Sequence, residues 1–381
     1  MKILAISGTR ADWGLLQPVL LMLRDNPKFT LEILVTGQHM MPGTTSVPEI
    51  QAAGFEIEHF LNMGLIGNET GASLCNATAK AVAGVGQVLE SSKPELVLVL
   101  GDRYEILAAV SAALISKVPV AHIAGGDVTE GAFDDSIRHA ITKMAALHFT
   151  TSEEAARRVR QMGEDPRHVF ATGNPGIDQV LATSLMSRSQ FFDSIGLIAQ
   201  KKNFIVTLHP ATLSKHNSKM CRAMIGAFDK IADVGLIFTG SNADPGAAEL
   251  DKIIQDWVLQ RPNATFHSSL GSQRYFSALQ HCDLVIGNSS SGLYEAPSFE
   301  IPTVNIGDRQ ARRIRAASVI DCKPETGAIL IAIEKALSGD WSGTVNPYGD
   351  GAAAPKIVSK LENFINPEQL IRKSFKDIHH D

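Results

Sequence analysis

Residues 96–105 have the sequence LVLVLGDRYE, in which five consecutive apolar residues run directly into a glycine and then into charged side chains. An uninterrupted apolar run of this length is typical of a strand buried on both faces, as in a parallel sheet. The same order recurs nearby: Gly8–Gly14 follows the apolar run Lys2–Ser7, and Ala124–Asp127 follows Val118–Ile123. Helical patterns separate these runs, so the sequence predicts βαβ units.

The alternation extends over the whole chain in two series. In the first half, strands are expected at Lys2–Ser7, Leu31–Thr36, Leu96–Leu100, Val118–Ile123, Leu147–Thr151 and Val169–Thr172. In the second half, they are expected at Phe204–Leu208, Leu236–Thr239, Ala264–His267, Leu284–Ile286, Thr303–Ile306 and Val319–Asp321. Amphipathic helices such as Ser136–Ala146 and Lys219–Asp233 lie between them. The predicted fold class is α/β, with two doubly wound Rossmann-like domains facing a cleft.

The alternation is interrupted near Gly173–Asn203, where the domain boundary is expected. We assign residues 1–175 to the first domain and residues 176–360 to the second. Residues 361–381 form a tail, and Ile357–Phe375 has a helical pattern. The long Gly/Met/Asn-rich stretch Gln38–Ser73 is interpreted as a loop that is either mobile or covers a ligand.

Composition excludes several classes of protein. The 381 residues exceed the ~250–300 at which one hydrophobic core stops growing, so a small binding module is excluded. Hydrophobic residues make up 44% and charged residues 20%, which is ordinary globular composition. The formal net charge of −5 gives no basic field for DNA or RNA, so no nucleic-acid partner is expected.

Cysteine usage and hydropathy predict the compartment. The four cysteines are far apart and form no CxxC pair, so neither a disulfide framework nor a thiolate zinc site is indicated. No HxxxH or HExxH spacing occurs, and no metal is expected. Neither a signal peptide nor a membrane span is predicted, and we expect a cytoplasmic protein with no membrane partner.

The polar clusters share one position, because each follows directly on an expected strand. In the second half these clusters are His209-Pro210, Asn242–Gly246 and Gly287–Gly292. Ligands of open parallel sheets bind beyond the carboxyl ends of the strands, so all six clusters are expected to converge on one cleft.

The turn Gly287–Gly292 has the sequence GNSSSG and is expected to lead into a helix near Leu293. Backbone N–H groups and serine hydroxyls in such a turn can bind a phosphate. The alternative is that Ser289 or Ser290 merely caps the helix. No Walker motif or dinucleotide fingerprint occurs, so no nucleotide cofactor is expected. Five arginines in or beside the turns favour a diphosphate ligand: Arg10, Arg103, Arg309, Arg312 and Arg313.

Acidic residues are dense near the strand ends of the first half. They are Asp102, Glu105, Asp127, Glu130, Asp134 and Asp135. Such carboxylates can serve as general acids and bases, although Asp134 could instead cap the helix that follows it. Asp127 follows two glycines, where backbone can approach a ligand closely. His209 stands at a strand end before a proline, as an acid/base candidate or a structural histidine.

With these motifs in view, the chain resembles the hydrolysing UDP-N-acetylglucosamine 2-epimerases of sialic acid biosynthesis, and more loosely the non-hydrolysing 2-epimerases. The motifs that carry the resemblance are Gly8–Asp12, Gly101–Arg103, Gly125-Gly126, Asp134–Lys143, His209-Pro210, Gly287–Ser290, Arg309-Gln310 and Asn346–Gly351. The resemblance implies a GT-B type architecture, with the sugar nucleotide between two Rossmann-like domains and the last helix packed back on the first.

The resemblance also implies a reaction. UDP-N-acetylglucosamine (UDP-GlcNAc) and water give N-acetylmannosamine and UDP, by anti elimination of UDP to 2-acetamidoglucal followed by hydration. Departure of the diphosphate must run ahead of removal of the C2 proton, because that proton is not acidic. Stabilising the departing UDP is then the main electrostatic task, and an acid and a base must flank C2.

The expected site residues come partly from the resemblance and partly from the polar clusters at the strand ends. The catalytic residues are expected to be Asp102, Asp127, Asp134 and His209, with His209 assisting at the leaving oxygen. The UDP or diphosphate site is expected to contain Arg10, His209, Asn242, Ser289, Ser290, Glu295, Arg309 and Arg313, with Glu295 on the ribose. The sugar site is expected to contain Asp102, Gly126 and Arg138.

One position departs from the resemblance. Many family members carry an acidic residue between His-Ile and Gly-Gly, and this chain has Ala124. The missing carboxylate leaves two substrates open: UDP-GlcNAc, or a UDP- or GDP-linked 2,4-diacetamido-2,4,6-trideoxyglucose of the legionaminic acid route. A glycosyltransferase and a non-catalytic sugar-nucleotide sensor are the competing readings. The partners expected are a UDP-sugar and a second copy of the chain, as a homodimer or homotetramer.

Overall fold

The computed structural model describes residues 1–67, 69–128, 133–210, 217–241, 247–311 and 313–377. The chain divides into two compact units. Unit 1 consists of Met1–Gln179 together with Tyr348–Asp381, and unit 2 of Val180–Pro347. Among the described residues, no helix combines the length and the apolar character needed to cross a membrane.

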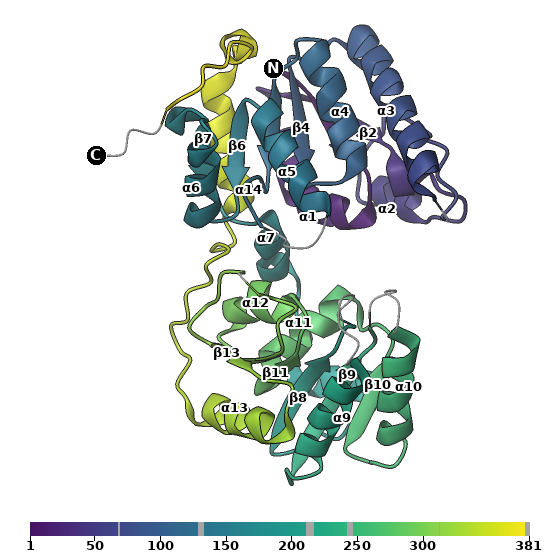
Figure 1. Ribbon diagram of the computed structural model, residues 1–381, viewed down its shortest axis with the longest axis vertical. Coiled ribbons are helices and arrows are strands. Elements are labelled where there is room, and N and C mark those ends of the chain that lie inside the picture. Colours follow the sequence, from purple (N-terminus) through teal and green to yellow (C-terminus); the bar gives the residue numbers. More distant parts are fainter. Residues whose placement is uncertain (68, 129–132, 211–216, 242–246, 312, 378–381) are drawn as a thin grey trace. The chain divides into compact units, whose positions relative to one another are not determined.

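Unit 1 is built on a parallel sheet of seven strands (Figure 1), in the order β3-β2-β1-β4-β5-β6-β7. The strands are β1 (Lys2–Ser7), β2 (Thr30–Val35), β3 (His59–Phe60), β4 (Leu96–Leu100), β5 (Val120–Ile123), β6 (Leu147–Thr150) and β7 (Val169–Ala171). β1 and β4 are fully or nearly fully buried along their lengths, because helices cover both faces of the sheet. All the strands point the same way, so the loops that follow them lie along one edge.

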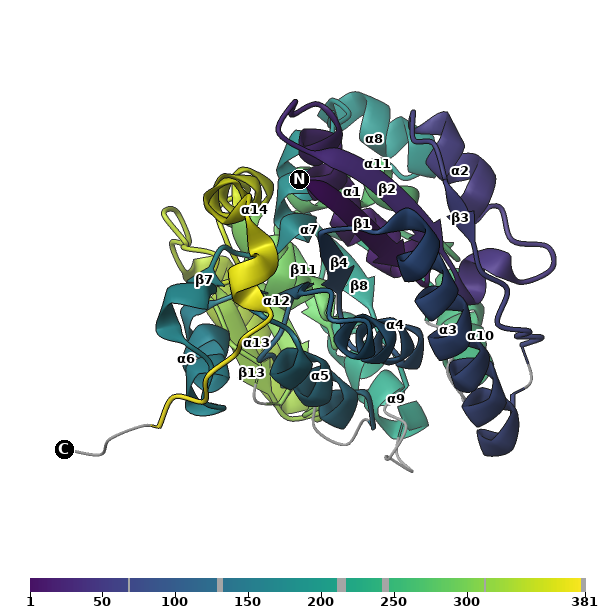
Figure 2. The ribbon, with the colours of Figure 1, turned by 90° about the horizontal axis from the view of Figure 1, so that it is seen from above.

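Helices cover the two faces of this sheet in two groups. The helices of unit 1 are α1 (Arg10–Arg24), α2 (Ser46–Ala52), α3 (Gly71–Ser92), α4 (Tyr104–Ile115), α5 (Phe133–Met144), α6 (Glu153–Gln161), α7 (Pro175–Ala182, which runs into unit 2) and α14 (Ala353–Leu361). One apolar cluster joins α1 and α14 to the sheet, and a second joins α3, α4 and α5 to the other face (Figure 2). The first domain is therefore doubly wound.

Unit 2 repeats this arrangement with six parallel strands in the order β10-β9-β8-β11-β12-β13. The strands are β8 (Lys202–Thr207), β9 (Val234–Thr239), β10 (Ala264–His267), β11 (Leu284–Gly287), β12 (Thr303–Ile306) and β13 (Val319–Cys322). The helices are α8 (Arg188–Ile195), α9 (Asn217–Phe228), α10 (Ala247–Val258), α11 (Gly271–His281), α12 (Ser291–Tyr294) and α13 (Thr326–Ser338). α9, α10 and α13 pack on one face, and α8 and α11 on the other. The predicted class, two doubly wound α/β domains, is confirmed.

Two predicted segments differ from the structure. Gln38–Ser73 contains a 3₁₀ turn, α2, β3 and the start of α3, so the interpretation as one long loop is wrong. The helix expected over Ile357–Phe375 ends at Leu361 and gives way to the 3₁₀ turns Glu362–Phe364 and Pro367–Leu370. Asn366 precedes a proline, which disfavours helical geometry at that residue.

α14 belongs to unit 1 because of its apolar face. Ile357, Val358 and Leu361 join Leu16 and Leu20 of α1 in one buried cluster. The chain therefore returns to the first sheet at Tyr348, whereas the sequence placed this return at residue 361.

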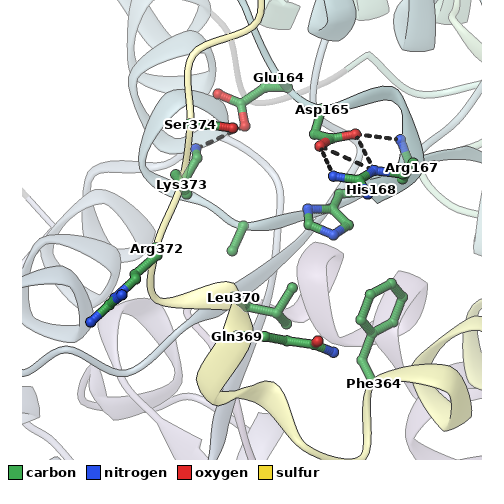
Figure 3. Close-up of a pocket in the computed structure, with 11 residues that line it drawn as sticks. Glu164, Asp165, Arg167, His168, Phe364, Gln369, Leu370, Arg372, Lys373 and Ser374 are labelled. Atoms are coloured by element: carbon green, nitrogen blue, oxygen red, sulfur yellow. Dashed lines mark hydrogen bonds and ion pairs between the residues drawn. The ribbon is translucent and has the colours of Figure 1, made fainter.

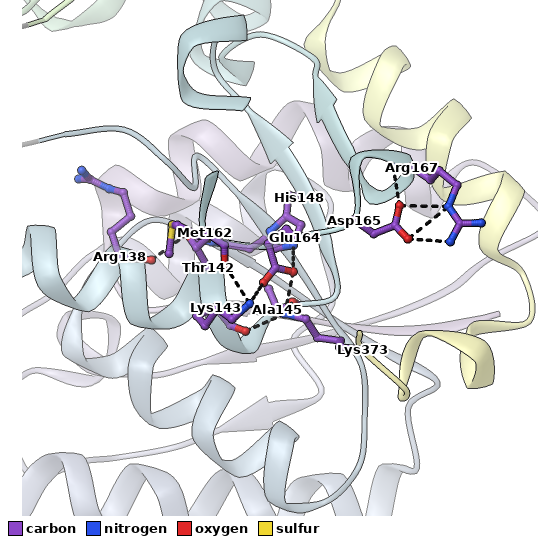
Figure 4. Close-up of polar contacts among 11 residues, drawn as sticks. Arg138, Thr142, Lys143, Ala145, His148, Met162, Glu164, Asp165, Arg167 and Lys373 are labelled. Atoms are coloured by element: carbon purple, nitrogen blue, oxygen red, sulfur yellow. Dashed lines mark hydrogen bonds and ion pairs between the residues drawn. The ribbon is translucent and has the colours of Figure 1, made fainter. Parts of the chain in front are cut away.

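The segment after α14 anchors the C-terminal end of α5 (Figure 4). Lys373 Nζ donates to the carbonyl of Lys143 at 2.7 Å and forms an ion pair with Glu164 at 2.8 Å. The same carboxylate pairs with Lys143 at 2.7 Å and contacts His148 at 3.0 Å. Burial alone would raise the pKa of Glu164, but hydrogen bonds from His148, Lys143 and Lys373 lower it to about 2. The buried carboxylate of Glu164 therefore connects the C-terminal segment, through Lys373, to α5, through Lys143.

Candidate active site

In unit 1, Asp102 and Arg138 form the centre of the candidate site. Asp102 stands directly after β4, in the loop before α4, and accepts from Arg138 Nη2. The side chain of Arg138 is only 10% exposed, and its Nη1 also donates to the carbonyl of Asp127 at 2.9 Å. Asp135 lies 3.6 Å from the same nitrogen. Arg138 therefore holds together the loops after β4 and β5 and the first turn of α5.

Asp134 lies in the first turn of α5, on the same side as this pair. Partial burial raises the pKa of Asp134, and the nearby charge of Asp102 raises it further, against the opposing charges of Arg103 and Arg138. The structure thus brings two of the predicted acid/base residues within electrostatic range of each other. A carboxyl group whose pKa is raised by burial and by a neighbouring charge is a candidate for acid/base catalysis.

The side chain of Asp127 makes a hydrogen bond to Thr151, at the end of a neighbouring strand. Its Oδ1 accepts a hydrogen bond from Thr151 Oγ1 at 2.7 Å, at the end of β6. Its carbonyl accepts a hydrogen bond from Arg138 Nη1 at 2.9 Å. The catalytic role of Asp127 stays a prediction.

The two glycines before Asp127 are required by packing inside unit 1. A Cβ on Gly125 would lie 2.8 Å from Thr142 Oγ1 and 2.9 Å from His122 Nδ1. A Cβ on Gly126, whose φ is +80°, would lie 2.4 Å from the carbonyl oxygen of Ala155. Close approach to a ligand is therefore not needed to explain these glycines, and the sugar contact expected at Gly126 stays a prediction.

His122, on β5, contacts the backbone next to Asp102 and, through Thr142, the backbone of Arg138. It is fully buried; its Nε2 lies 2.8 Å from the carbonyl of Gly101, and its Nδ1 lies 3.3 Å from Thr142 Oγ1. Thr142 Oγ1 also lies 2.8 Å from the carbonyl of Arg138. Gly101 precedes Asp102, so one buried histidine fixes the backbone on both sides of the ion pair. Burial lowers the pKa of His122 to about 3.

This histidine predicts a pH dependence of stability. Because the pKa in the folded state lies below the unfolded value of 6.5, the contribution of His122 is complete above pH 6.5 and is lost as the pH falls toward 3. We expect His122→Gln to reduce the acid slope of the free energy of unfolding by about 1.4 kcal/mol per pH unit in that window. Urea unfolding at pH 7, 6 and 5 measures the slope. His139→Gln controls for removal of a histidine as such; equal slopes in both variants would contradict the assignment.

Three buried groups near this edge were missed as site residues. Asp12 follows β1, His39 follows β2, and Glu105 follows β4; all three are less than a tenth exposed. Glu105 had been noted only as one of six carboxylates. Asp12 Oδ2 and Glu105 Oε2 have no hydrogen-bond partner among the described residues. Burial raises the pKa of Asp12 to about 6, the Thr9 hydrogen bond lowering it and nearby charges adding smaller effects of both signs. The signals in the sequence were their positions after strands and, for Asp12, its place in the Gly8–Asp12 motif.

Ala124 has a left-handed backbone. Its φ is +65°, and its N–H donates to the carbonyl of Phe149 at 2.9 Å. Alanine adopts this conformation at a cost of about 1–2 kcal/mol, and such residues cluster at functional sites. The substitution that departs from the family resemblance therefore stands at a strained position, at the end of β5.

In unit 2, the turn after β11 lies against the loop after β8. Gly287 has a φ of +136°, and a Cβ there would lie 1.9 Å from the carbonyl oxygen of Thr207. Asn288 is 1% exposed and His209 7% exposed, and the side chain of Asn288 bonds to the backbone of His209. Arg309 Nη1 donates to the carbonyl of Asn288 at 3.2 Å. The structure thus gathers His209, the glycine-serine turn and Arg309.

The remaining nucleotide-site residues lie as follows. Ser289 and Ser290 are half-buried in the turn, and Ser290 makes no side-chain cap to α12. α12 begins at Ser291 and has only four residues, rather than starting near Leu293. Glu295 ends α12, and burial raises its pKa. The guanidinium of Arg313 lies 5.4 Å from the centre of the Tyr294 ring.

Arg10 is the first residue of α1, in unit 1. Its side chain is 66% exposed and pairs with Glu49 at 3.1 Å. Its role at the phosphates stays a prediction. Three other residues of the sequence interpretation, Asn242, Arg312 and Glu130, lie outside the described residues.

A pocket of about 370 Å³ lies elsewhere on unit 1, between the loop after α6 and the C-terminal segment (Figure 3). None of the predicted site residues lines it. Its charged side chains are largely paired with one another, Arg167 with Asp165 at 2.6 Å and Lys373 with Glu164 at 2.8 Å. We assign this pocket no ligand.

The sequence of this chain is similar to a known protein family and to several proteins of known name. The family model described as UDP-N-acetylglucosamine 2-epimerase matches residues 21–362. A Campylobacter jejuni protein named GDP/UDP-N,N'-diacetylbacillosamine 2-epimerase (hydrolyzing) is 33% identical over 385 residues, covering 99% of each chain. The Escherichia coli polysialic acid biosynthesis protein P7 is 34% identical and covers 99% of this chain and 97% of its own. A Neisseria meningitidis UDP-N-acetylglucosamine 2-epimerase is 31% identical and covers 96% of each.

Solved structures show the same fold. A UDP-GlcNAc 2-epimerase from Neisseria meningitidis bound to UDP-GlcNAc has a TM-score of 0.78 at 21% identity, covering 95% of this chain and 100% of its own. The enzyme of that name from Methanocaldococcus jannaschii has a TM-score of 0.78 at 20% identity, with the same coverage.

Proposed function

The chain belongs to the UDP-N-acetylglucosamine 2-epimerase family, and from that premise we propose that it is a hydrolysing 2-epimerase of a nucleotide-linked 2-acetamido sugar. Water and the sugar nucleotide give the free sugar with inverted C2 and a nucleoside diphosphate. The single observation that carries the proposal is the cluster of Asp102, Asp134 and Arg138 at the carboxyl edge of the first sheet.

The chemistry requires two kinds of group. Elimination needs a base for the C2 proton and positive charge or hydrogen-bond donors for the departing diphosphate; hydration needs an acid that returns a proton to C2 from the opposite face. Asp102 and Asp134 supply the carboxyl groups, because they lie close together and the pKa of Asp134 is raised. Ser289, Ser290 and Arg309 supply donors for the diphosphate, and His209 assists at the leaving oxygen.

For the sugar, UDP-GlcNAc is the first candidate, with N-acetylmannosamine and UDP as products. The family description and the Neisseria meningitidis relative bear the name of this substrate. The destination of the product would be sialic acid. The chain would act as a homodimer or homotetramer.

A second candidate is a UDP- or GDP-linked 2,4-diacetamido-2,4,6-trideoxyglucose. Ala124 favours it, because a methyl group replaces the acidic side chain that the family resemblance leads one to expect at the end of β5. The loss of a charged side chain suits a sugar with fewer hydroxyl groups. The Campylobacter jejuni relative is named for a diacetamido sugar.

The experiment offers each sugar nucleotide to the protein in D₂O and follows the products by NMR. We expect a free manno-configured sugar with deuterium at C2 and one equivalent of nucleoside diphosphate. Comparison of kcat/KM between the two sugars decides the substrate. Transfer to an acceptor without deuterium at C2 would replace the proposal with a glycosyltransferase, and tight binding with no turnover would replace it with a sensor.

A further inference from the structure

We propose that Asn288 is a positioning residue that holds His209 in place beside the glycine-serine turn, so that the turn and the histidine act as one rigid group at the leaving diphosphate. The inference rests on the proposed function and deepens it.

The contact is a pair of hydrogen bonds in opposite directions. The N–H of His209 donates to Asn288 Oδ1 at 2.7 Å, and Asn288 Nδ2 donates to the carbonyl of His209 at 2.8 Å. The side-chain amide of Asn288 thus exchanges two hydrogen bonds with the backbone of His209, as two opposed residues do in an antiparallel sheet. Both residues are more than nine-tenths buried, so water competes little with these two hydrogen bonds.

The pair extends the sheet beyond its last strand residues. β8 ends at Thr207 and β11 at Gly287, and the N–H of Asn288 still donates to the carbonyl of Thr207 at 3.1 Å. The side chain of Asn288 then reaches two residues further along, to His209. The loop after β8 therefore continues to be hydrogen-bonded to the chain after β11 as far as His209. The next residue, Pro210, has no N–H to donate.

The other side of Asn288 is held by the segment after β12. Its carbonyl accepts from Gln310 Nε2 at 2.8 Å and from Arg309 Nη1 at 3.2 Å. Gln310 is 1% exposed, so this support is internal to unit 2. One buried asparagine therefore connects His209 to Arg309, two residues that the proposed function places at the diphosphate.

A purely structural role predicts a different result, and the chain contains a matched control. Asn203, at the start of β8, is fully buried and bonds to one backbone residue in the same way: its Oδ1 accepts from the N–H of Gln200 at 2.9 Å, and its Nδ2 donates to that residue's carbonyl at 3.0 Å. It lies at the opposite end of the same strand. Asn203→Ala removes two equivalent bonds far from His209.

The experiment compares Asn288→Ala, Asn203→Ala, His209→Ala and the double variant Asn288→Ala/His209→Ala in the full chain. We expect Asn288→Ala to lower kcat by about 10²-fold, as expected for a misplaced reacting group, with a Kd for UDP within about threefold of the parent. Asn203→Ala should lower the thermal midpoint similarly and change kcat by less than about threefold. If Asn288 acts through His209, the double variant should be no slower than His209→Ala by more than about twofold.

Equal kcat values for Asn288→Ala and Asn203→Ala, or multiplicative losses in the double variant, would overturn the inference. Should Asn288→Ala fail to fold, Asn288→Asp keeps the acceptor for the His209 N–H and loses only the donor, and should show the same selective loss of kcat. An inactive parent on every sugar nucleotide would sink the proposed function instead. In that case the ¹H–¹⁵N resonances of the His209 ring test the inference, since they should shift in Asn288→Ala and not in Asn203→Ala.

Discussion

Asp102→Asn is expected to lower kcat by about 10³-fold while the Kd for UDP stays within about threefold of the parental value. The substitution keeps the size of the side chain and one acceptor for Arg138, so the loops after β4 and β5 stay joined. The amide cannot exchange the C2 proton. A loss in kcat without a loss in UDP binding is the pattern of a group that acts in the chemical step. Asp134→Asn is expected to give the same pattern.

The matched control is Asp135→Asn. Asp135 lies on the same turn of α5 and 3.6 Å from Arg138, yet it is not assigned to the reaction. We expect it to lose less than about tenfold in kcat. Steady-state kinetics with titration of UDP separates the variants; an Asp102→Asn protein with turnover near that of the parent would remove Asp102 from the mechanism.

Gly287→Ala is expected to have the largest effect on stability. The added Cβ would lie 1.9 Å from the carbonyl oxygen of Thr207 and would hold alanine at a φ of +136°, so β8 and β11 must separate. We expect the free energy of unfolding of unit 2 to fall by more than about 4 kcal/mol, or the protein to be insoluble. Denaturant unfolding followed by tryptophan fluorescence measures the loss, because Trp257 and Trp341 pack against the core of unit 2.

Gly271→Ala provides the comparison in the same unit. Gly271 also has a positive φ, +67°, but a Cβ there would meet nothing within 4 Å. Its cost is that of left-handed alanine alone, about 1–2 kcal/mol. If the two alanine variants were equally stable, the clash at Gly287 would not be real.

The strands were predictable because their signal is local. β1, β4, β10 and β12 have the predicted bounds, since each is a short apolar or β-prone run closed by polar or turn residues. β3 was missed because two residues carry no periodic pattern. The helix predicted for the tail is too long because its helical pattern continues past Leu361, whereas Pro367 starts a 3₁₀ turn and Leu370 is buried in the apolar cluster of unit 1.

The candidate site was predictable only as positions along strand ends. The rule for parallel sheets placed Asp102 and Asp134 in one region, and burial followed by the nearby charge of Asp102 raises the pKa of Asp134. The rule gave no sign that Asp127 bonds to Thr151, 24 residues away, or that Asn288 bonds to His209, 79 residues away. Burial of Asp12 and Glu105 likewise depends on neighbours distant in sequence. The hydrogen-bond partner of a buried polar group depends on residues far away in the sequence, so local sequence patterns do not predict it.

Unit 1 takes its residues from both ends of the chain, and this has a consequence for biosynthesis. Translation delivers α1 and α5 early, but α14 and Lys373, which cover the first and brace the second, leave the ribosome only after all of unit 2. The part of the apolar surface of α1 that packs against α14 therefore stays exposed while the whole of unit 2 is made. A chain released before residue 353 would contain all of unit 2 but would lack the helix that completes the apolar cluster around α1.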